Sequence, residues 1–379
     1  MNRYKWILIL FFIWAVSSVA VGQTTITFKR SWGKGGNHAG QFHGPFSVAV
    51  DPSGNLWVAD LENGRIQKID VVSNVFEVFP MEPYTHRPQS VSLDDLIGKS
   101  SSPAADLAFK RDLQPEKPTS RENFVSQQKL LGSMPAFDAP ETTFLSKPDP
   151  GIDQRWFFFT SYVNQPFSLA IDARNFLYIA DSKYKLVQKV DLGSKARKGI
   201  GGYGSGFGHY EVPISVAVDF EGNVYVVDVQ LIKLLKYGPS GKTILQVDLE
   251  KVGNKVPPGI SVDGTGNIYV VDSARDKLQK FNRYGKLIRE WGGKGDKAGQ
   301  FHQPVGVATD DHRHVYVADF DNNRIQIFDE NGKFLAEWGN RGTEAEKMNG
   351  PTGVAVGKGG KIYVCDYKNN RIQEFEVKF

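Results

Sequence analysis

One sequence unit recurs six times along the chain, and its clearest copy runs from Pro304 to Asp329. Each copy opens with a proline and a short apolar run, crosses a turn to a second apolar run that closes on aspartate, and ends in an RIQ-like segment. The opening prolines are Pro45, Pro166, Pro213, Pro258, Pro304 and Pro351. A fixed repeat constrains the fold strongly, because each copy forms one unit that packs on its neighbours.

The closing aspartates give the register of the repeat: Asp60, Asp181, Asp228, Asp272, Asp319 and Asp366. From Asp181 onward, successive aspartates are 47, 44, 47 and 47 residues apart. Short runs rich in Val, Ile and Tyr, bounded by Gly, Asp and Asn, are typical of strands and tight turns. A period in the mid-forties with four such runs is that of a propeller blade. The sequence therefore predicts an all-β fold, a six-bladed β-propeller of four-stranded antiparallel blades.

The two ends of the repeat predict how the ring closes. The last copy ends at Phe379 after three predicted strands. The segment TITFKRSWG, which begins at Thr25, matches KLIREWG and KFLAEWG, the outermost strands of complete copies. We therefore expect the N-terminal strand to complete the C-terminal blade, which leaves no open sheet edge.

Two segments fall outside the repeat. Residues 1–22 combine basic residues, the apolar stretch WILILFFIWAV and small residues, a pattern typical of a secretory signal peptide cleaved before Gln23. An uncleaved anchor is the alternative. The propeller would then span 23–379, with a Pro-rich, partly disordered insertion at 80–153 that could be a surface loop, a lid or a partner-binding arm. Both NVFEVFP before it and RWFFFTS after it are candidates for the first blade's outer strand.

Composition limits the function classes. The chain has 46 basic and 42 acidic residues, a net charge of +4, which gives no nucleic-acid signal by itself. We expect no nucleic-acid partner, no membrane span beyond the signal segment, and a monomer in the cell envelope, periplasm or extracellular space. The single cysteine, Cys365, occupies a position that holds Ala or Val in the other copies, which favours a buried small hydrophobe over a reactive thiol.

The segment GQFHQPVGVATD, continued by HVYVADFDNNRIQIFDENGKFLAEWG, resembles the NHL repeat. The resemblance implies a six-bladed NHL propeller. That family includes ligand-binding sensors, protein- and RNA-binding platforms, and the peptidyl-hydroxyglycine lyases, which place zinc-binding histidines just after the blade proline. The corresponding positions here are Phe46, Phe167, Ile214, Gly259, Val305 and Thr352. None is a zinc ligand, so we expect no metal and no cofactor.

Residues present in most copies are expected to build the blades. The six aspartates should accept backbone N–H bonds in the loop that follows them. Arg65, Arg324 and Arg371, five residues further on, should bond to them. An aromatic set is expected to pack between blades: Trp57, Tyr178, Tyr225, Tyr269, Tyr316 and Tyr363.

Residues that differ between copies are the better functional candidates. The residue two before each proline should lie around one mouth of the central channel, at His43, Asn164, Glu211, Val256, His302 and Asn349. The Gly-rich loop 199–210 adds Tyr203, Phe207 and Tyr210 as ligand contacts. Function resides in such residues rather than in the fold. The sequence favours an exported binding or scaffold module for a protein, peptide or glycan, with no catalytic residue assigned. The alternative is a metal-dependent lyase or hydrolase at the channel mouth.

Overall fold

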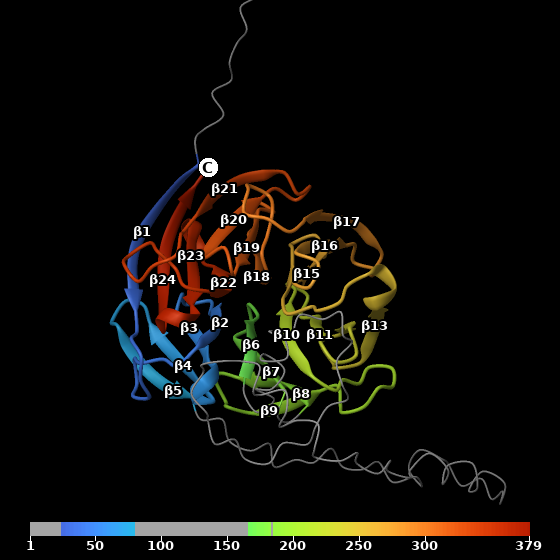
Figure 1. The fold of residues 1–379 in the computed structure, drawn as a ribbon. Helices are drawn as coiled ribbons and strands as arrows, with labels where there is room; N and C mark the ends of the chain where they lie inside the picture. Colours follow the sequence, from blue (N-terminus) through green and yellow to red (C-terminus); the bar gives the residue numbers. More distant parts are fainter. Residues whose placement is uncertain (1–23, 80–165, 183–184) are drawn as a thin grey trace, which may run out of the picture. The chain divides into compact units, whose positions relative to one another are not determined.

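The computed structural model describes residues 24–79, 166–182 and 185–379. These residues form six four-stranded antiparallel sheets arranged as a ring, so the predicted six-bladed β-propeller is confirmed (Figure 1). The predicted signal segment at 1–22, the insertion at 80–153 and the segment RWFFFTS lie outside the described residues. Within the described residues, no helix is both long and apolar enough to cross a membrane.

Each blade runs from an inner strand near the axis to an outer strand at the circumference. The first blade contains β2 (Pro45–Val50), β3 (Leu56–Asp60), β4 (Arg65–Asp70) and β5 (Val75–Phe79). The second contains β6 (Pro166–Ile171), β7 (Phe176–Asp181), β8 (Leu186–Asp191) and β9 (Arg197–Ile200). The third contains β10 (Pro213–Val218), β11 (Val224–Asp228), β12 (Lys233–Tyr237) and β13 (Thr243–Asp248). The VFEVF segment therefore provides the first blade's outer strand, β5.

The remaining blades follow the same order. The fourth contains β14 (Ile260–Val262), β15 (Ile268–Asp272), β16 (Lys277–Phe281) and β17 (Leu287–Gly292). The fifth contains β18 (Pro304–Thr309), β19 (Val315–Asp319), β20 (Arg324–Phe328) and β21 (Phe334–Trp338). The sixth contains β22 (Pro351–Val356), β23 (Lys361–Asp366), β24 (Arg371–Lys378) and β1 (Thr25–Trp32). Short 3-10 turns lie at Leu61–Asn63 (η1), Glu250–Val252 (η3), Lys358–Gly360 (η4) and Tyr367–Asn369 (η5).

The second strand of each blade forms the core. Every residue of β3, β11, β15 and β19 is buried, because neighbouring blades cover both faces of the sheet at this radius. A strand buried on both faces reads as a continuous apolar run, as VYVVD and VYVAD do. The outer strands β17 and β21 hold only partly buried and exposed residues, since they lie at the circumference of the ring.

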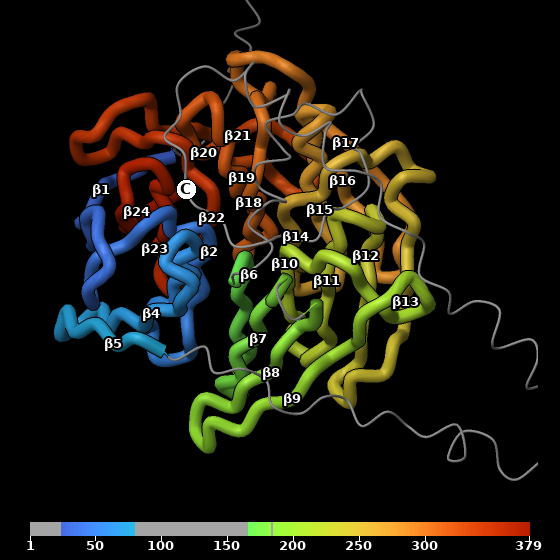
Figure 2. Tube along the Cα trace, turned by 60° about the horizontal axis from the view of Figure 1, so that its bottom comes forward, coloured from blue at the N-terminus to red at the C-terminus, as the bar shows by residue number. Residues whose placement is uncertain are grey.

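The ring closes as the sequence predicted. β1 pairs antiparallel with β24, from Thr25 opposite Lys378 to Trp32 opposite Ile372. The Nε of Arg30 lies 2.7 Å from a carboxylate oxygen of Glu374 across this pair. Figures 1 and 2 both show the blue β1 beside the red β24. The inner strand β2 contacts both β6 and β22, so the first and last blades meet.

Neighbouring inner strands approach one another closely at positions that hold serine or glycine. In the first half of the ring, serine hydroxyls bridge them: Ser47 Oγ accepts the Leu169 N–H at 3.2 Å, and Ser168 Oγ accepts the Val216 N–H at 3.2 Å. The later blades have glycine instead, and a Cβ on Gly306 would lie 2.1 Å from the carbonyl oxygen of Thr352. These positions of the channel wall therefore hold neighbouring blades together.

Candidate functional site

Two sets of loops meet at one end of the channel, which we call the rim face. One set enters the inner strands, and the other joins the second and third strands of each blade. In the first blade the Glu62 N–H donates to the His43 carbonyl at 3.0 Å, which ties the two loops together. The remaining loops form the opposite face.

The repeated aspartates build this rim. Asp60 is fully buried, and its Oδ1 accepts the His43 N–H at 2.7 Å while its Oδ2 accepts from Arg65 Nε at 2.7 Å. Asp319 and Asp366 have the same partners at the same spacing. All six aspartates are at most 1% exposed: Asp60, Asp181, Asp228, Asp272, Asp319 and Asp366. Their carboxylates are buried within the framework and are not exposed to a ligand.

The repeated arginines fasten the loop that leads into the inner strand. Beyond its bond to Asp60, the Arg65 guanidinium donates to the backbone carbonyls of Asn37, His38 and Gln41. Arg324 and Arg371 each donate to three carbonyls of the equivalent loops. These side chains therefore determine the conformation of the loops that carry the rim residues.

A second repeated aspartate, which sequence analysis did not single out, explains the aromatic set. It closes the inner strand and lies on the opposite face. Asp51 Oδ2 accepts from Trp57 Nε1 at 3.2 Å, and Asp172 Oδ2 accepts from the Tyr178 hydroxyl at 3.1 Å. Three further pairs have the same arrangement: Tyr225 with Asp219, Tyr269 with Asp263 and Tyr316 with Asp310. Burial, reinforced by the neighbouring carboxylate, raises the pKa of these tyrosines, so their hydroxyls remain protonated donors.

Between the sixth and first blades, the rim holds a three-residue polar cluster. His43 Nε2 lies 2.8 Å from one carboxylate oxygen of Glu62. The other oxygen of Glu62 accepts a hydrogen bond from the Tyr367 hydroxyl, which comes from the sixth blade. The His43 side chain is 50% exposed, whereas that of Glu62 is only 22% exposed. A partly buried carboxylate thus orients a histidine that faces solvent.

A second histidine–carboxylate pair lies on the fifth blade. His302 Nε2 is 3.8 Å from Asp321, a looser pair than that of His43 and Glu62. The Tyr367 ring lies between the two pairs, because it packs against Phe46 of the first blade and Phe320 of the fifth. Phe46 also lines the channel. The two pairs therefore flank an aromatic contact at the channel mouth.

The other predicted rim residues are less concentrated. The Asn349 N–H donates to Asp366, and the Glu211 N–H donates to Asp228, so both positions face the rim. Tyr203 is 64% exposed. Asn164 lies outside the described residues.

Two predicted positions need correction. Tyr210 is fully buried, and its hydroxyl donates to the Ile200 carbonyl, so it has no surface with which to touch a ligand.

The fourth rim residue is Lys255 rather than the buried Val256, because Lys255 lies 17 residues before Asp272, as His43 does before Asp60. The same one-residue shift makes Pro257 the blade proline, so Pro258 rather than Gly259 follows it.

Sequence analysis missed the other half of the rim. The residue two positions after each closing aspartate lies opposite the predicted rim residue. Backbone hydrogen bonds show this, because the N–H groups of Glu62, Asp321 and Lys368 donate to the carbonyls of His43, His302 and Asn349, respectively. The signal was present, because this position changes from copy to copy between the invariant aspartate and the RIQ-like segment.

Across the described residues, no group of three or more His, Cys, Asp or Glu side chains is arranged to hold a metal ion.

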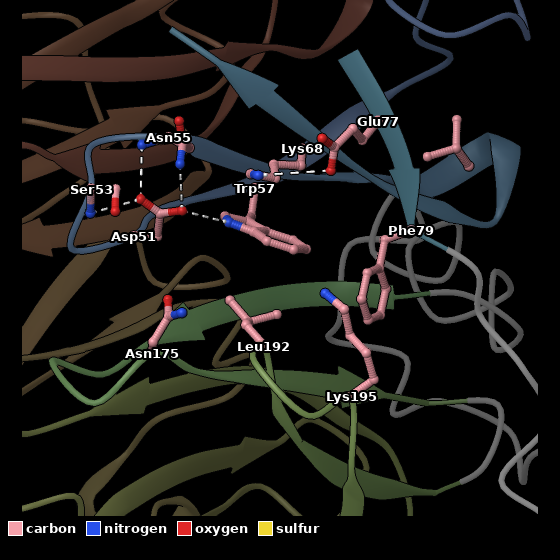
Figure 3. Close-up of a pocket in the computed structure, with 11 residues that line it drawn as sticks. Asp51, Ser53, Asn55, Trp57, Lys68, Glu77, Phe79, Asn175, Leu192 and Lys195 are labelled. Atoms are coloured by element: carbon pink, nitrogen blue, oxygen red, sulfur yellow. Dashed lines mark hydrogen bonds and ion pairs between the residues drawn. The ribbon is translucent and has the colours of Figure 1, made fainter. Parts of the chain in front are cut away.

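A pocket of about 210 Å³ lies between the first and second blades on the opposite face (Figure 3). Its walls include Asp51, Trp57, Lys68, Glu77 and Lys195. Figure 3 shows the polar groups of the first blade bonded to one another: Asp51 accepts from Asn55 and Trp57, and Lys68 pairs with Glu77 at 3.7 Å. Asp51 and Trp57 belong to the repeated aspartate–aromatic framework, so this pocket is a weaker candidate site than the rim.

Comparison with known proteins defines the class. Residues 42–69, 301–328 and 348–375 match the family described as the NHL repeat. These stretches cover the first, fifth and sixth blades, where the aspartate, arginine and loop carbonyls form the complete network. The chain therefore contains NHL repeats in three of the six blades of its β-propeller.

Similar solved structures share the ring. A protein of unknown function from Bacteroides thetaiotaomicron is 13% identical, with a TM-score of 0.60 over 94% of this chain and 77% of its own. Virginiamycin B lyase from Staphylococcus aureus is 10% identical, with a TM-score of 0.52 over 94% and 100%. A gluconolactonase from Xanthomonas campestris is 10% identical, with a TM-score of 0.54 over 94% and 98%. At these identities the likeness concerns the fold alone.

Proposed function

We propose that the protein is an exported binding module that recognises a peptide or glycan at the channel mouth of its rim face. One observation carries the proposal: the rim pairs differ from blade to blade, whereas the Asp–Arg framework beneath them is repeated. His43 with Glu62, His302 with Asp321, and Asn349 with Lys368 are three different pairs on equivalent positions. Variation at positions that the fold does not require is typical of a recognition surface on a rigid scaffold.

The chemistry of the mouth suits a ligand with hydrogen-bonding groups around an apolar or ring-shaped body. Histidine and carboxylate side chains supply donors and acceptors, and the aromatic contact of Phe46 with Tyr367 supplies a surface for sugar rings or apolar side chains. The signal-like segment at 1–22 supports an envelope or extracellular location. The module would act as a monomer, without a cofactor.

The test is binding of the purified protein to a peptide array and a glycan array. The rim variant carries His43→Ala, Glu62→Ala, His302→Ala and Asp321→Ala, and the control variant carries Arg283→Ala and Arg289→Ala on exposed positions away from the rim. We expect ligands that bind the wild type and the control but lose about 10-fold or more in affinity with the rim variant. Ligands that bind all three proteins equally would contradict the proposal.

A second candidate is a hydrolase or lyase acting at the same mouth, and the His43–Glu62–Tyr367 cluster favours it. A carboxylate that orients a solvent-facing histidine is an arrangement suited to general acid–base catalysis. His43 and Glu62 could also offer two ligands to a metal ion. Lactone hydrolysis, suggested by the gluconolactonase of similar fold, is the first activity to assay. Turnover that disappears in His43→Ala and persists in His302→Ala would support this candidate over simple binding.

A further inference from the structure

Four loops that enter inner strands share one backbone conformation. Each contains an isolated parallel bridge between residues seven apart: Gly35 with Phe42, Tyr203 with Tyr210, Lys294 with Phe301, and Arg341 with Met348. The second residue of every bridge is fully buried and anchors the base of the loop. The loops can therefore be compared position by position.

The loop before the third blade differs from its three counterparts at two exposed positions. Tyr203 replaces Gly35, Lys294 and Arg341, and Phe207 replaces Ala39, Ala298 and Ala345. Tyr203 is 64% exposed and Phe207 is 65% exposed. Since alanine satisfies the same backbone in three blades, the fold does not require an aromatic side chain at Phe207.

The position equivalent to Arg65 also makes fewer hydrogen bonds to this loop than the arginines make to the other three. The equivalent of the Arg65 position is Lys233, which donates to a single loop carbonyl, that of Ser205. Five of the eight residues from Gly201 to Gly208 are glycine. Exposed aromatic side chains on a Gly- and Ser-rich loop are the combination that antibody paratopes use to contact proteins.

The charge around the two aromatic residues is positive. Lys185 Nζ lies 4.1 Å from the centre of the Tyr203 ring. Neither Lys185 nor Lys233 forms an ion pair with a carboxylate in the part of the chain that the structure describes. A surface that presents aromatic side chains beside uncompensated ammonium groups is complementary to an apolar pocket edged by carboxylates.

We propose that the loop 201–209 is a docking surface for a partner protein, with Tyr203 and Phe207 as anchors that enter an apolar pocket bordered by Asp or Glu. This surface is separate from the His43 and His302 pairs of the rim and does not depend on them.

The experiment uses phage-displayed random linear peptides as the probe, selected against the full protein. We expect enriched peptides to combine apolar residues with Asp or Glu. Tyr203→Ala/Phe207→Ala should lower the affinity of the protein for these peptides by about 10-fold or more. Lys185→Glu should lower this affinity as well. The matched control is Phe220→Ala/Tyr284→Ala, which removes two aromatic residues of somewhat greater exposure from the opposite face. Enriched peptides that weaken with His43→Ala/His302→Ala and not with Tyr203→Ala/Phe207→Ala would bind the channel mouth instead and would contradict this inference, so failure of this inference and failure of the channel-mouth proposal are distinguishable.

Three further results would overturn the inference. One is a selection without enriched peptides, and another is an equal loss of binding in the Phe220/Tyr284 control. The third comes from sedimentation with vesicles of phosphatidylglycerol and phosphatidylcholine. If those vesicles bind the protein and the Tyr203/Phe207 variant no longer does, the loop contacts a membrane surface instead. A thermal unfolding curve for each variant excludes loss of the fold as the cause.

Discussion

Arg65 Nε lies 2.7 Å from the buried Asp60 Oδ2, and the rest of the guanidinium holds three backbone carbonyls of the loop that carries His43. The repeated Asp–Arg pair therefore connects the blade core to the rim. It also explains why arginine, with a planar fork of donors, occupies this position in the three most regular copies. The second blade has Leu186 at this position, and its apolar side chain cannot form these hydrogen bonds.

Replacing Arg65 with Leu, the residue of the second blade, should destabilise the protein by about 2 kcal/mol or more, because Asp60 loses a charged partner while it remains buried. Arg289→Leu is the matched control, since Arg289 is exposed and donates at 3.3 Å to one carbonyl, that of Asn331. Urea unfolding at constant pH measures both. Equal stability of the two variants would show that the Asp60–Arg65 contact contributes little.

Replacing Gly306 with Ala should destabilise the ring by about 1–3 kcal/mol, because the added methyl group must displace the neighbouring inner strand. The new Cβ would lie 2.1 Å from the Thr352 carbonyl oxygen. Gly264→Ala is the control, since no atom lies within 4 Å of its added Cβ. Thermal unfolding should separate the two variants clearly. A Gly306→Ala protein as stable as Gly264→Ala would mean that the blades can move apart freely.

Ionisation of Asp272 should lower the free energy of unfolding as the pH rises from about 4 to about 6. Burial raises the pKa of Asp272 to about 6, against 3.8 for an unperturbed aspartate, although backbone N–H groups and Arg275 oppose the shift. Between these values the folded state binds more protons than the unfolded state, so stability falls with rising pH.

The burial of the Asp272 carboxylate in the fourth blade is incompletely compensated by hydrogen bonds. Asp272 Oδ2 accepts no hydrogen bond in the described structure, because Gln279 donates to Val252 rather than to the aspartate. Asp272→Asn should flatten the pH dependence by about 1–3 kcal/mol between pH 4 and 7. Unfolding free energies of both proteins across that range provide the test, and parallel curves would refute the assignment.

Cys365 should be unreactive toward thiol reagents in the folded protein. It is fully buried in β23, and burial raises the pKa of its thiol, which further limits formation of the thiolate nucleophile. Labelling with iodoacetamide should be negligible without denaturant and complete in urea. Rapid labelling of the native protein would show that the sixth blade opens, or that the thiol has a chemical role.

The sequence predicted the elements more fully than their contacts. The six blades and the β1–β24 closure follow from repeated strand patterns, and Trp32 matches the Trp of other outer strands. The error at Lys255 arose because Pro257 and Pro258 are adjacent, and only the spacing to Asp272 distinguishes the register. The Glu62–Tyr367 contact joins residues 305 positions apart and belongs to one junction between blades, so no repeat pattern reveals it.

The burial of Tyr210, in contrast, was predictable. It aligns with Phe42, Phe301 and Met348, which are all apolar, so the position is part of the loop base in each blade. Tyr203 and Phe207 differ from their counterparts, and that departure from the repeat is the more informative signal.

The most direct test of the central claim is hydrogen exchange, measured by mass spectrometry, with and without the tightest ligand found on the peptide and glycan arrays. Recognition at the channel mouth predicts slower exchange in the rim-face segments 34–44, 61–64, 293–303, 320–323 and 367–370, with the opposite face unchanged. Protection confined to the opposite-face loops, such as 51–55 and 172–175, would contradict the account and move the binding site to the other end of the ring.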